Sequence, residues 1–141
     1  MTETPIRYND AQIIEEFRSN GGVVGGDFAR VRLLLLCTIG ARSEMQRETP
    51  LFYRPDGDNF VVFGSQYGAP NHPGWYHNLV AHPSVRVEVG TEVFDALARV
   101  TTGEERDRRW KELIARYERF HEYEVRAAPY RVIPVVVLER V

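Results

Sequence analysis

The chain has 141 residues, of which 43% are hydrophobic and 27% are charged, as in an ordinary globular protein. This length fits one domain. The formal net charge of −2 excludes a general nucleic-acid binder, because such proteins need a basic surface to displace counterions from phosphates. With Cys37 as its single cysteine, the chain can form neither an internal disulfide nor a cysteine-based zinc site.

The sequence also bears on the compartment. The longest apolar run, LLLLC, is far too short to span a bilayer. The opening stretch, MTETPIRYNDAQIIEEF, has no apolar segment of the kind found in secretory signals. We therefore predict a cytoplasmic protein with no integral membrane segment.

The first third of the chain predicts one helix and one strand. Residues 9–20 carry apolar side chains on one helical face and end at Asn20-Gly21, a common helix stop. The next stretch, GGVVGGDF, predicts a loop. The apolar run at 31–38 predicts a buried strand, and the polar residues 40–48 predict a loop.

The middle of the chain predicts a hairpin followed by a short helix. Residues 49–54 and 59–65 predict two strands, because the PDGD between them is a strong turn sequence. Residues 73–81 predict a helix, since proline is tolerated at the first helical position. His82-Pro83 is expected to end it.

The last third predicts a second hairpin, a charged helix and a final strand. Apolar and polar residues alternate on both sides of the Gly90-Thr91 turn. Thr102 and Glu105 have capping-box spacing and predict the start of a helix. The expected buried side of that helix consists of Trp110, Leu113, Ile114 and Tyr117. Residues 132–138 predict the final strand.

The predicted elements define the fold class. About six short strands, mostly in hairpins, are combined with three to four helices, which predicts a mainly β protein of the α+β type. Antiparallel hairpins favour a small barrel or sandwich over a parallel sheet. We expect one domain overall, with residues 1–27 as an N-terminal helix and glycine-rich loop attached to residues 28–141.

Metal and nucleophile chemistry have little support. His72, His77 and His82 are spaced by five, which separates neighbours by about 140° around a helix, so they do not converge on one ion. We therefore predict no metal site. Cys37 lies in an apolar strand, where cysteine behaves as a small hydrophobe, and the chain has no nucleophile-elbow motif.

Two polar stretches are candidate binding loops. Arg42 and Ser43 follow a buried strand, and Arg47 and Thr49 come soon after, so forked guanidinium donors and hydroxyls could bind an anion there. A solvated loop with two arginines is the alternative.

The second stretch is SQYGAPNHPGWYHNL. Ser65 ends a predicted strand, and Gly68 permits a close backbone approach to a ligand. Trp75 and Asn78 are three residues apart on one helical face, where an indole beside a carboxamide suits a flat heterocycle with polar edges. Alternatively, Trp75 belongs to the core and Asn78 caps the helix.

The order of these segments resembles a known family. The stretches LLLLCTIGARSE, RETPLFY, PDGDNF, SQYGAPNHPGWYHNLVAHPSVRVEVG, TTGEERDRRW and IPVVVLERV resemble the deazaflavin-dependent nitroreductase family of actinobacteria. The resemblance covers roughly Phe28 to Val141. It implies a split β-barrel of the FMN-binding type that binds reduced coenzyme F420 and transfers a hydride to a quinone, a nitro compound or an activated alkene.

The resemblance also implies which residues form the site. Arg42, Ser43 and Arg47 match the phosphate-binding positions, and Trp75 and Asn78 lie on the helix that closes the cofactor groove. The full set of implied cofactor-binding residues is Arg42, Ser43, Arg47, Thr49, Pro50, Phe63, Gly64, Ser65, Gln66, Gly68, Trp75 and Asn78. Phe52, Phe120 and Tyr123 match the substrate side, and the hydroxyls of Tyr123 and Ser65 are the implied proton donors.

The chain departs from the family at both loops. Ala41 and Glu44 stand where the family has a basic residue and glycine, and Gln66-Tyr67 replaces Lys-Gly. Each lost charge-assisted contact costs about 1.5–3 kcal/mol. These changes leave two alternatives open, namely an FMN- or FAD-binding split-barrel flavoprotein and a non-catalytic carrier of a hydrophobic ligand or tetrapyrrole. The expected partner is a small redox substrate, and the chain is expected to be a monomer or a homodimer.

Overall fold

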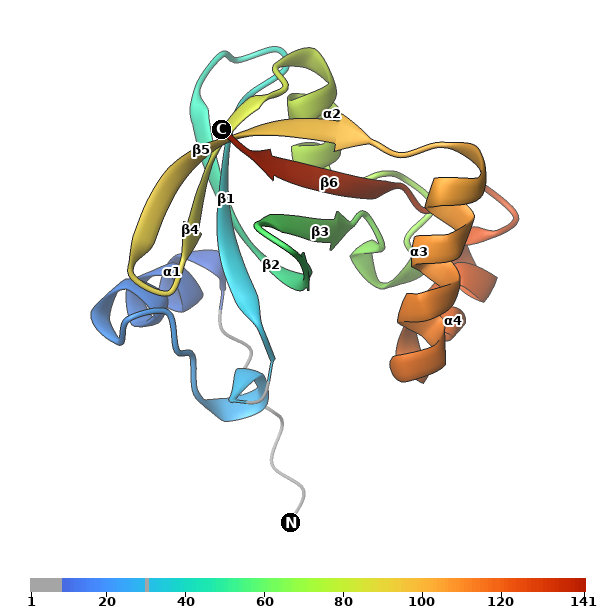
Figure 1. Cartoon of the computed structure of the whole chain (residues 1–141), viewed down its shortest axis with the longest axis horizontal. Helices are drawn as coiled ribbons and strands as arrows, with labels where there is room; N and C mark the ends of the chain where they lie inside the picture. Colours follow the sequence, from blue (N-terminus) through green and yellow to red (C-terminus); the bar gives the residue numbers. More distant parts are fainter. Residues whose placement is uncertain (1–8, 30) are drawn as a thin grey trace.

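A computed structural model describes residues 9–29 and 31–141. Six strands form a closed antiparallel barrel in the order β1-β2-β3-β6-β5-β4, which confirms the predicted fold class (Figure 1). The strands are β1 (Leu33–Ile39), β2 (Gln46–Asp56), β3 (Asn59–Phe63), β4 (Ser84–Val89), β5 (Glu92–Val100) and β6 (Val135–Arg140).

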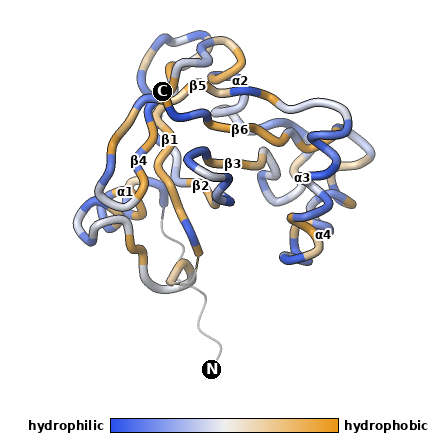
Figure 2. Tube along the Cα trace, viewed as in Figure 1, coloured by the Kyte–Doolittle hydropathy of each residue, from blue (hydrophilic) through white to orange (hydrophobic). Residues whose placement is uncertain are grey.

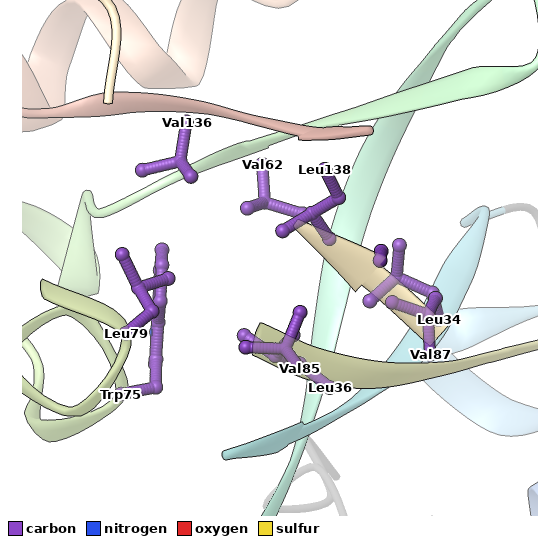
Figure 3. Packing of buried hydrophobic residues seen from close by; sticks show 10 residues of the cluster. Leu34, Leu36, Val62, Trp75, Leu79, Val85, Val87, Val136 and Leu138 are labelled. Atoms are coloured by element: carbon purple, nitrogen blue, oxygen red, sulfur yellow. The ribbon is translucent and has the colours of Figure 1, made fainter. Parts of the chain in front are cut away.

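Along each strand every second side chain points inward, and these side chains fill the barrel interior. Leu34 pairs with Leu51, and Leu36 pairs with Thr49, so these side chains share one face of the sheet. The buried interior cluster consists of Leu34, Leu36, Val62, Trp75, Leu79, Val85, Val87, Ala96, Val136 and Leu138 (Figure 3). Each fully buried aliphatic side chain contributes about 1.5–3 kcal/mol to folding.

Several strand boundaries differ from the prediction, most of all the starts of β2 and β6. Strand β2 already begins at Gln46, because Thr38 pairs with Arg47 and Ile39 pairs with Gln46. Residues 46–48 are polar because they are exposed on the strand, not because they form a loop. Strand β6 begins at Val135 instead of 132, directly after Pro134, which has no N–H to donate to a ladder.

Helix α1 (Asp10–Ser19) matches the predicted helix and packs on the outside of the barrel. The Asn9 side chain accepts from the Gln12 amide at 2.9 Å, and the Gln12 side chain accepts from the Asn9 amide at 3.0 Å. This capping box fixes the start of the helix. Ile13 and Phe17 are buried, and they belong to the cluster that covers the outer face of β1.

Helix α2 (Gly74–Ala81) adds its apolar side to the barrel core. Figure 3 shows Trp75 and Leu79 next to Val136 of β6. Pro73 is the N-cap and not the first helical residue, so the helix begins at Gly74, one residue later than predicted, and His82 ends it as expected.

Helices α3 (Gly103–Arg116) and α4 (Glu118–Ala127) pack outside β3 and β6 through an aromatic cluster. The predicted buried side of α3 is confirmed for Trp110 and Leu113, whereas Ile114 and Tyr117 are half-buried and Tyr117 directly follows the helix. The predicted capping box is wrong, because the Thr102 side chain makes no cap hydrogen bond and Glu105 binds Arg99 at 2.7 Å instead. Helix α4 had no separate sequence prediction.

Hydropathy along the chain follows this arrangement. Figure 2 shows a mostly hydrophobic trace along β1, whereas much of the α3 trace is hydrophilic. Two short 3-10 helices, η1 (Gly26–Phe28) and η2 (Gln66–Gly68), lie in loops. Within the described ranges, no helix combines the length and apolar character that crossing a bilayer requires.

Candidate functional site

Strand β2 pairs with different strands along its two halves. Residues 46–52 pair with β1, and only residues 53–56 pair with β3. Among the described residues, the β3-facing edge of β2 from Gln46 to Phe52 therefore has no strand partner. We call residues 46–52 the open β2 edge. Its unpaired backbone groups can bind a ligand.

Both predicted loops adjoin this edge. The loop at 40–45 leads directly into it. The loop at 64–69 starts where β3 ends, and the Phe52 and Phe63 rings are 6.3 Å apart across that junction. The two loops thus lie at the two ends of the open β2 edge, and α2, which follows the second loop in the chain, contacts the first loop through Asn78 (Figure 1).

Asn78 of α2 fixes the first loop. Its side-chain oxygen accepts from the Ala41 amide at 3.0 Å, and its side-chain nitrogen donates to the Thr38 hydroxyl at 3.1 Å. Thr38 is only 1% exposed, so Asn78 satisfies a buried polar group. The structure thus gives Asn78 a loop-holding contact, whereas the sequence suggested a cofactor contact or a helix cap.

The first loop presents cationic and hydroxyl groups to solvent. Arg42, Ser43 and Arg47 are exposed, and the Ser43 hydroxyl accepts from the Met45 amide at 3.2 Å. Neither arginine takes part in an ion pair within the described part of the chain. The loop is tight, because a Cβ on Gly40 would lie 2.3 Å from the Ser43 hydroxyl. Arg42 on the loop and Arg47 at the start of β2 thus offer two exposed guanidinium groups that suit an anion.

Thr49 and Pro50 face opposite sides of β2. Thr49 pairs with Leu36, whose side chain is inside the barrel, and Pro50 pairs with Leu35, which packs outside. Their side chains therefore cannot both contact one face of a planar ring. Pro50 shares the outer face with Phe52, and all three predicted residues are half-buried.

The second loop has an unusual backbone. Ser65 is right-handed (φ −73°, ψ −41°), but φ is +41° at Gln66, +56° at Tyr67 and +81° at Gly68. Positive φ is costly for residues other than glycine. This explains why glycine suits position 67 in the family pattern. Tyr67 is held by an edge-on contact with Tyr123, at 5.8 Å between ring centres.

The structure gives a tertiary reason for glycine at position 68. A Cβ at this position would lie 2.7 Å from both the Tyr123 carbonyl oxygen and the Arg126 Cβ. The structure therefore shows a close backbone approach of Gly68 to α4, and the expected approach to a ligand stays a prediction. Arg126 also donates to the Tyr67 carbonyl at 3.1 Å, a contact that the sequence did not predict.

Five predicted site residues are buried, namely Phe63, Gly64, Gly68, Trp75 and Phe120. Trp75 is 6% exposed and lies in the barrel core, which agrees with the alternative interpretation that Trp75 is a core residue. Phe120 is 4% exposed and packs with Phe63 in the aromatic cluster under α3 and α4. Gly64 is buried too, and a Cβ there would lie 2.7 Å from the Pro134 ring. None of these five residues presents an exposed side chain to a ligand.

The predicted proton donors remain accessible. Ser65 and Tyr123 are both half-buried, and Gln66 beside Ser65 is exposed. The Tyr123 ring packs against Phe120 at 5.5 Å.

Neither the histidines nor the cysteine adds a reactive group. His72 and His77 have ring centres 5.9 Å apart, and no cluster of three metal-binding side chains occurs among residues 9–29 and 31–141. Burial raises the pKa of the Cys37 thiol, with the nearby Glu48 carboxylate adding to the shift, which keeps the sulfur protonated. A depression of about 520 Å³ beside α1 is lined by none of the predicted site residues.

Comparison with known proteins identifies the family. The profile of the family described as F420H(2)-dependent quinone reductase matches residues 11–140. An F420H(2)-dependent quinone reductase of Mycobacterium tuberculosis is 40% identical over 110 residues, which cover 76% of this chain and 72% of that protein.

Two solved structures are also similar. One, described as an F420-H2 dependent reductase, is 36% identical with a TM-score of 0.67 and covers 77% of this chain and 94% of its own. Another, described as a domain-swapped dimer, is 35% identical with a TM-score of 0.70 and covers 89% and 91%. The chain therefore belongs to the F420H(2)-dependent quinone reductase family, and it is a reductase whose cofactor is coenzyme F420.

Proposed function

We propose that this chain reduces a quinone with reduced coenzyme F420 bound along the open β2 edge. The observation that carries the proposal is the arrangement around Asn78, whose amide joins the arginine loop to α2 beside that edge. Further support comes from the two candidate loops at the ends of the open β2 edge, because the first loop leads into Gln46 and the second begins where β3 ends beside Phe52.

The donor set fits an anionic cofactor. Arg42 and Arg47 are exposed cations without a recorded ion-pair partner among the described residues, and the Ser43 hydroxyl lies between them in the sequence. Guanidinium groups bind phosphate and carboxylate oxygens through forked hydrogen bonds. These two residues would hold the phosphate or the acidic tail, and they offset the missing cation at Gln66.

When bound, the reduced deazaflavin supplies a hydride. Reduction of a quinone to a hydroquinone adds one hydride and one proton, so an acceptor oxygen needs a proton donor. The Ser65 and Tyr123 hydroxyls are the proposed donors, and their hydrogen bonds would stabilise the negative charge that develops on that oxygen. Phe52 and Tyr67 would border the acceptor with apolar surface.

Titration of the purified protein with coenzyme F420, followed by cofactor fluorescence, tests this proposal. We expect binding in the micromolar range or tighter, and Arg42→Ala should weaken it by about 10-fold or more, as loss of a charge-assisted contact implies. Arg108→Ala is the matched control, because Arg108 is also an exposed arginine and lies on α3. An absence of binding at tens of micromolar would sink the proposal.

Acceptor choice and the flavin alternative need separate measurements. Turnover of reduced F420 should be faster with a soluble quinone than with a nitroaromatic compound or an activated alkene. Parallel titration with FMN and FAD should show no comparable binding. Light scattering on the purified chain would decide between monomer and homodimer, and it would show whether the chain shares the dimeric state of the domain-swapped relative.

A further inference from the structure

Arg131 makes four hydrogen-bond contacts near the proposed site, and it lies outside the sequence segments that resemble the family. It precedes β6 in the sequence and is half-buried. Its guanidinium donates to the carbonyl oxygens of Gly64 at 2.8 Å, Ser65 at 2.9 Å and Ala69 at 2.8 Å. One side chain thus binds both ends of the loop that contains Ser65 and Gln66.

The fourth contact of this guanidinium is with a histidine. Arg131 lies 3.0 Å from Nδ1 of His72, and a guanidinium has donors only. His72 Nδ1 must therefore accept, which makes this imidazole neutral in the observed arrangement. No carboxylate lies within 4 Å of Arg131 among the described residues. Its positive charge is consequently not cancelled by an ion pair.

These contacts determine where the loop's N–H groups point. In a planar trans peptide, the carbonyl and the following N–H point in opposite directions. Because the carbonyls of Gly64 and Ser65 point at Arg131, the amides of Ser65 and Gln66 point away from it. Two successive N–H groups therefore face the other side of the loop, where they are available to an anionic or strongly polar edge of a ligand.

We propose that Arg131 is a positioning residue that holds the Ser65 and Gln66 amides toward the cofactor and supplies positive charge behind the loop. The inference rests on the proposed F420 site and adds a residue that does not touch the cofactor. It also explains how the chain manages without a lysine at position 66. The backbone amides and the unpaired guanidinium take over part of that electrostatic contribution.

The test compares two substitutions with a matched control. Arg131→Gln removes the charge and most of the fork, while Arg131→Lys keeps the charge but cannot span three carbonyls. Arg106→Gln is the control, because Arg106 is also half-buried and donates to a backbone carbonyl, that of Ile133, at 2.7 Å.

We expect the F420 dissociation constant to rise by about 10- to 100-fold in Arg131→Gln, less in Arg131→Lys, and less than 2-fold in Arg106→Gln. Hydrogen exchange of the ligand-free protein should speed up at the Ser65 and Gln66 amides in both Arg131 variants and stay unchanged in the control. A positioning role also predicts that the bound cofactor's fluorescence spectrum differs between wild type and Arg131→Lys.

The binding and exchange measurements distinguish a failure of the Arg131 inference from a failure of the proposed function. If wild type binds F420 and Arg131→Lys binds it equally well with unchanged loop exchange, the inference is overturned and the proposed function stands. If wild type itself fails to bind, the proposed function is overturned together with this inference. Should Arg131→Gln fail to fold, Arg131→Lys still provides both measurements.

Discussion

Replacing Asn78 with alanine separates a loop-holding role from direct cofactor binding. The change removes the acceptor for the Ala41 amide and the donor to the Thr38 hydroxyl. Ala41 is exposed, so water can replace its partner at little cost. Thr38 is 1% exposed, and a buried hydroxyl left without a partner costs about 1–3 kcal/mol.

We therefore expect Asn78→Ala to lower the free energy of unfolding by about 2–3 kcal/mol, most of it from Thr38. Urea unfolding measures this directly. A double-mutant cycle with Thr38→Val should recover about 1 kcal/mol, because removing both polar partners leaves no unsatisfied group. F420 affinity should fall as well, since the arginine loop loses its anchor.

Two results would refute this reasoning. A loss of F420 affinity without any loss of stability would mean that the Asn78 carboxamide contacts the cofactor itself. A loss of stability that is identical with and without the Thr38 hydroxyl would mean that the observed hydrogen bond contributes nothing. Asn78→Asp refines the comparison, because it keeps the acceptor for the Ala41 amide and removes only the donor.

Three further outcomes follow from local geometry. Gly68→Ala should lower the free energy of unfolding in urea by about 2–4 kcal/mol, because position 68 has a positive φ and a Cβ there would lie 2.7 Å from Tyr123. Gly74→Ala should lower it by less than about 1 kcal/mol, because a Cβ there meets nothing within 4 Å. Equal effects of the two substitutions would contradict this. Trp75→Ala should cost about 3–5 kcal/mol as a core truncation, and a cost under about 1 kcal/mol would show an exposed indole. Burial and the neighbouring Arg131 lower the pKa of His72 below its ordinary value of 6.5, so the unfolded chain binds more protons than the folded chain. The free energy of unfolding should therefore fall as pH drops below about 6.5. His72→Gln should remove part of this pH dependence in unfolding measured at pH 5–8, and an unchanged pH dependence would contradict the assignment.

Much of the fold could be read from local patterns. Alternating apolar residues and the PDGD turn predicted the β2–β3 hairpin, because both depend on neighbours close in the chain. The start of β2 was not predicted, because residues 46–48 are polar and show no alternation of apolar and polar residues. Both features indicate a loop in a sequence, although these residues are an exposed part of the strand. Thr102 shows the opposite failure, where a correct local pattern lost its partner because Glu105 binds Arg99.

The sequence by itself determined the family, the barrel and the candidate loops, because short motifs encode turns, strands and their order. Only the tertiary structure decided what individual residues do. Asn78 reaches Thr38 from 40 positions away, and Arg131 reaches Gly64 from 67 positions away. Such contacts leave no spacing signal in one chain, because their geometry exists only after the barrel closes and brings α2, β1 and the segment before β6 together.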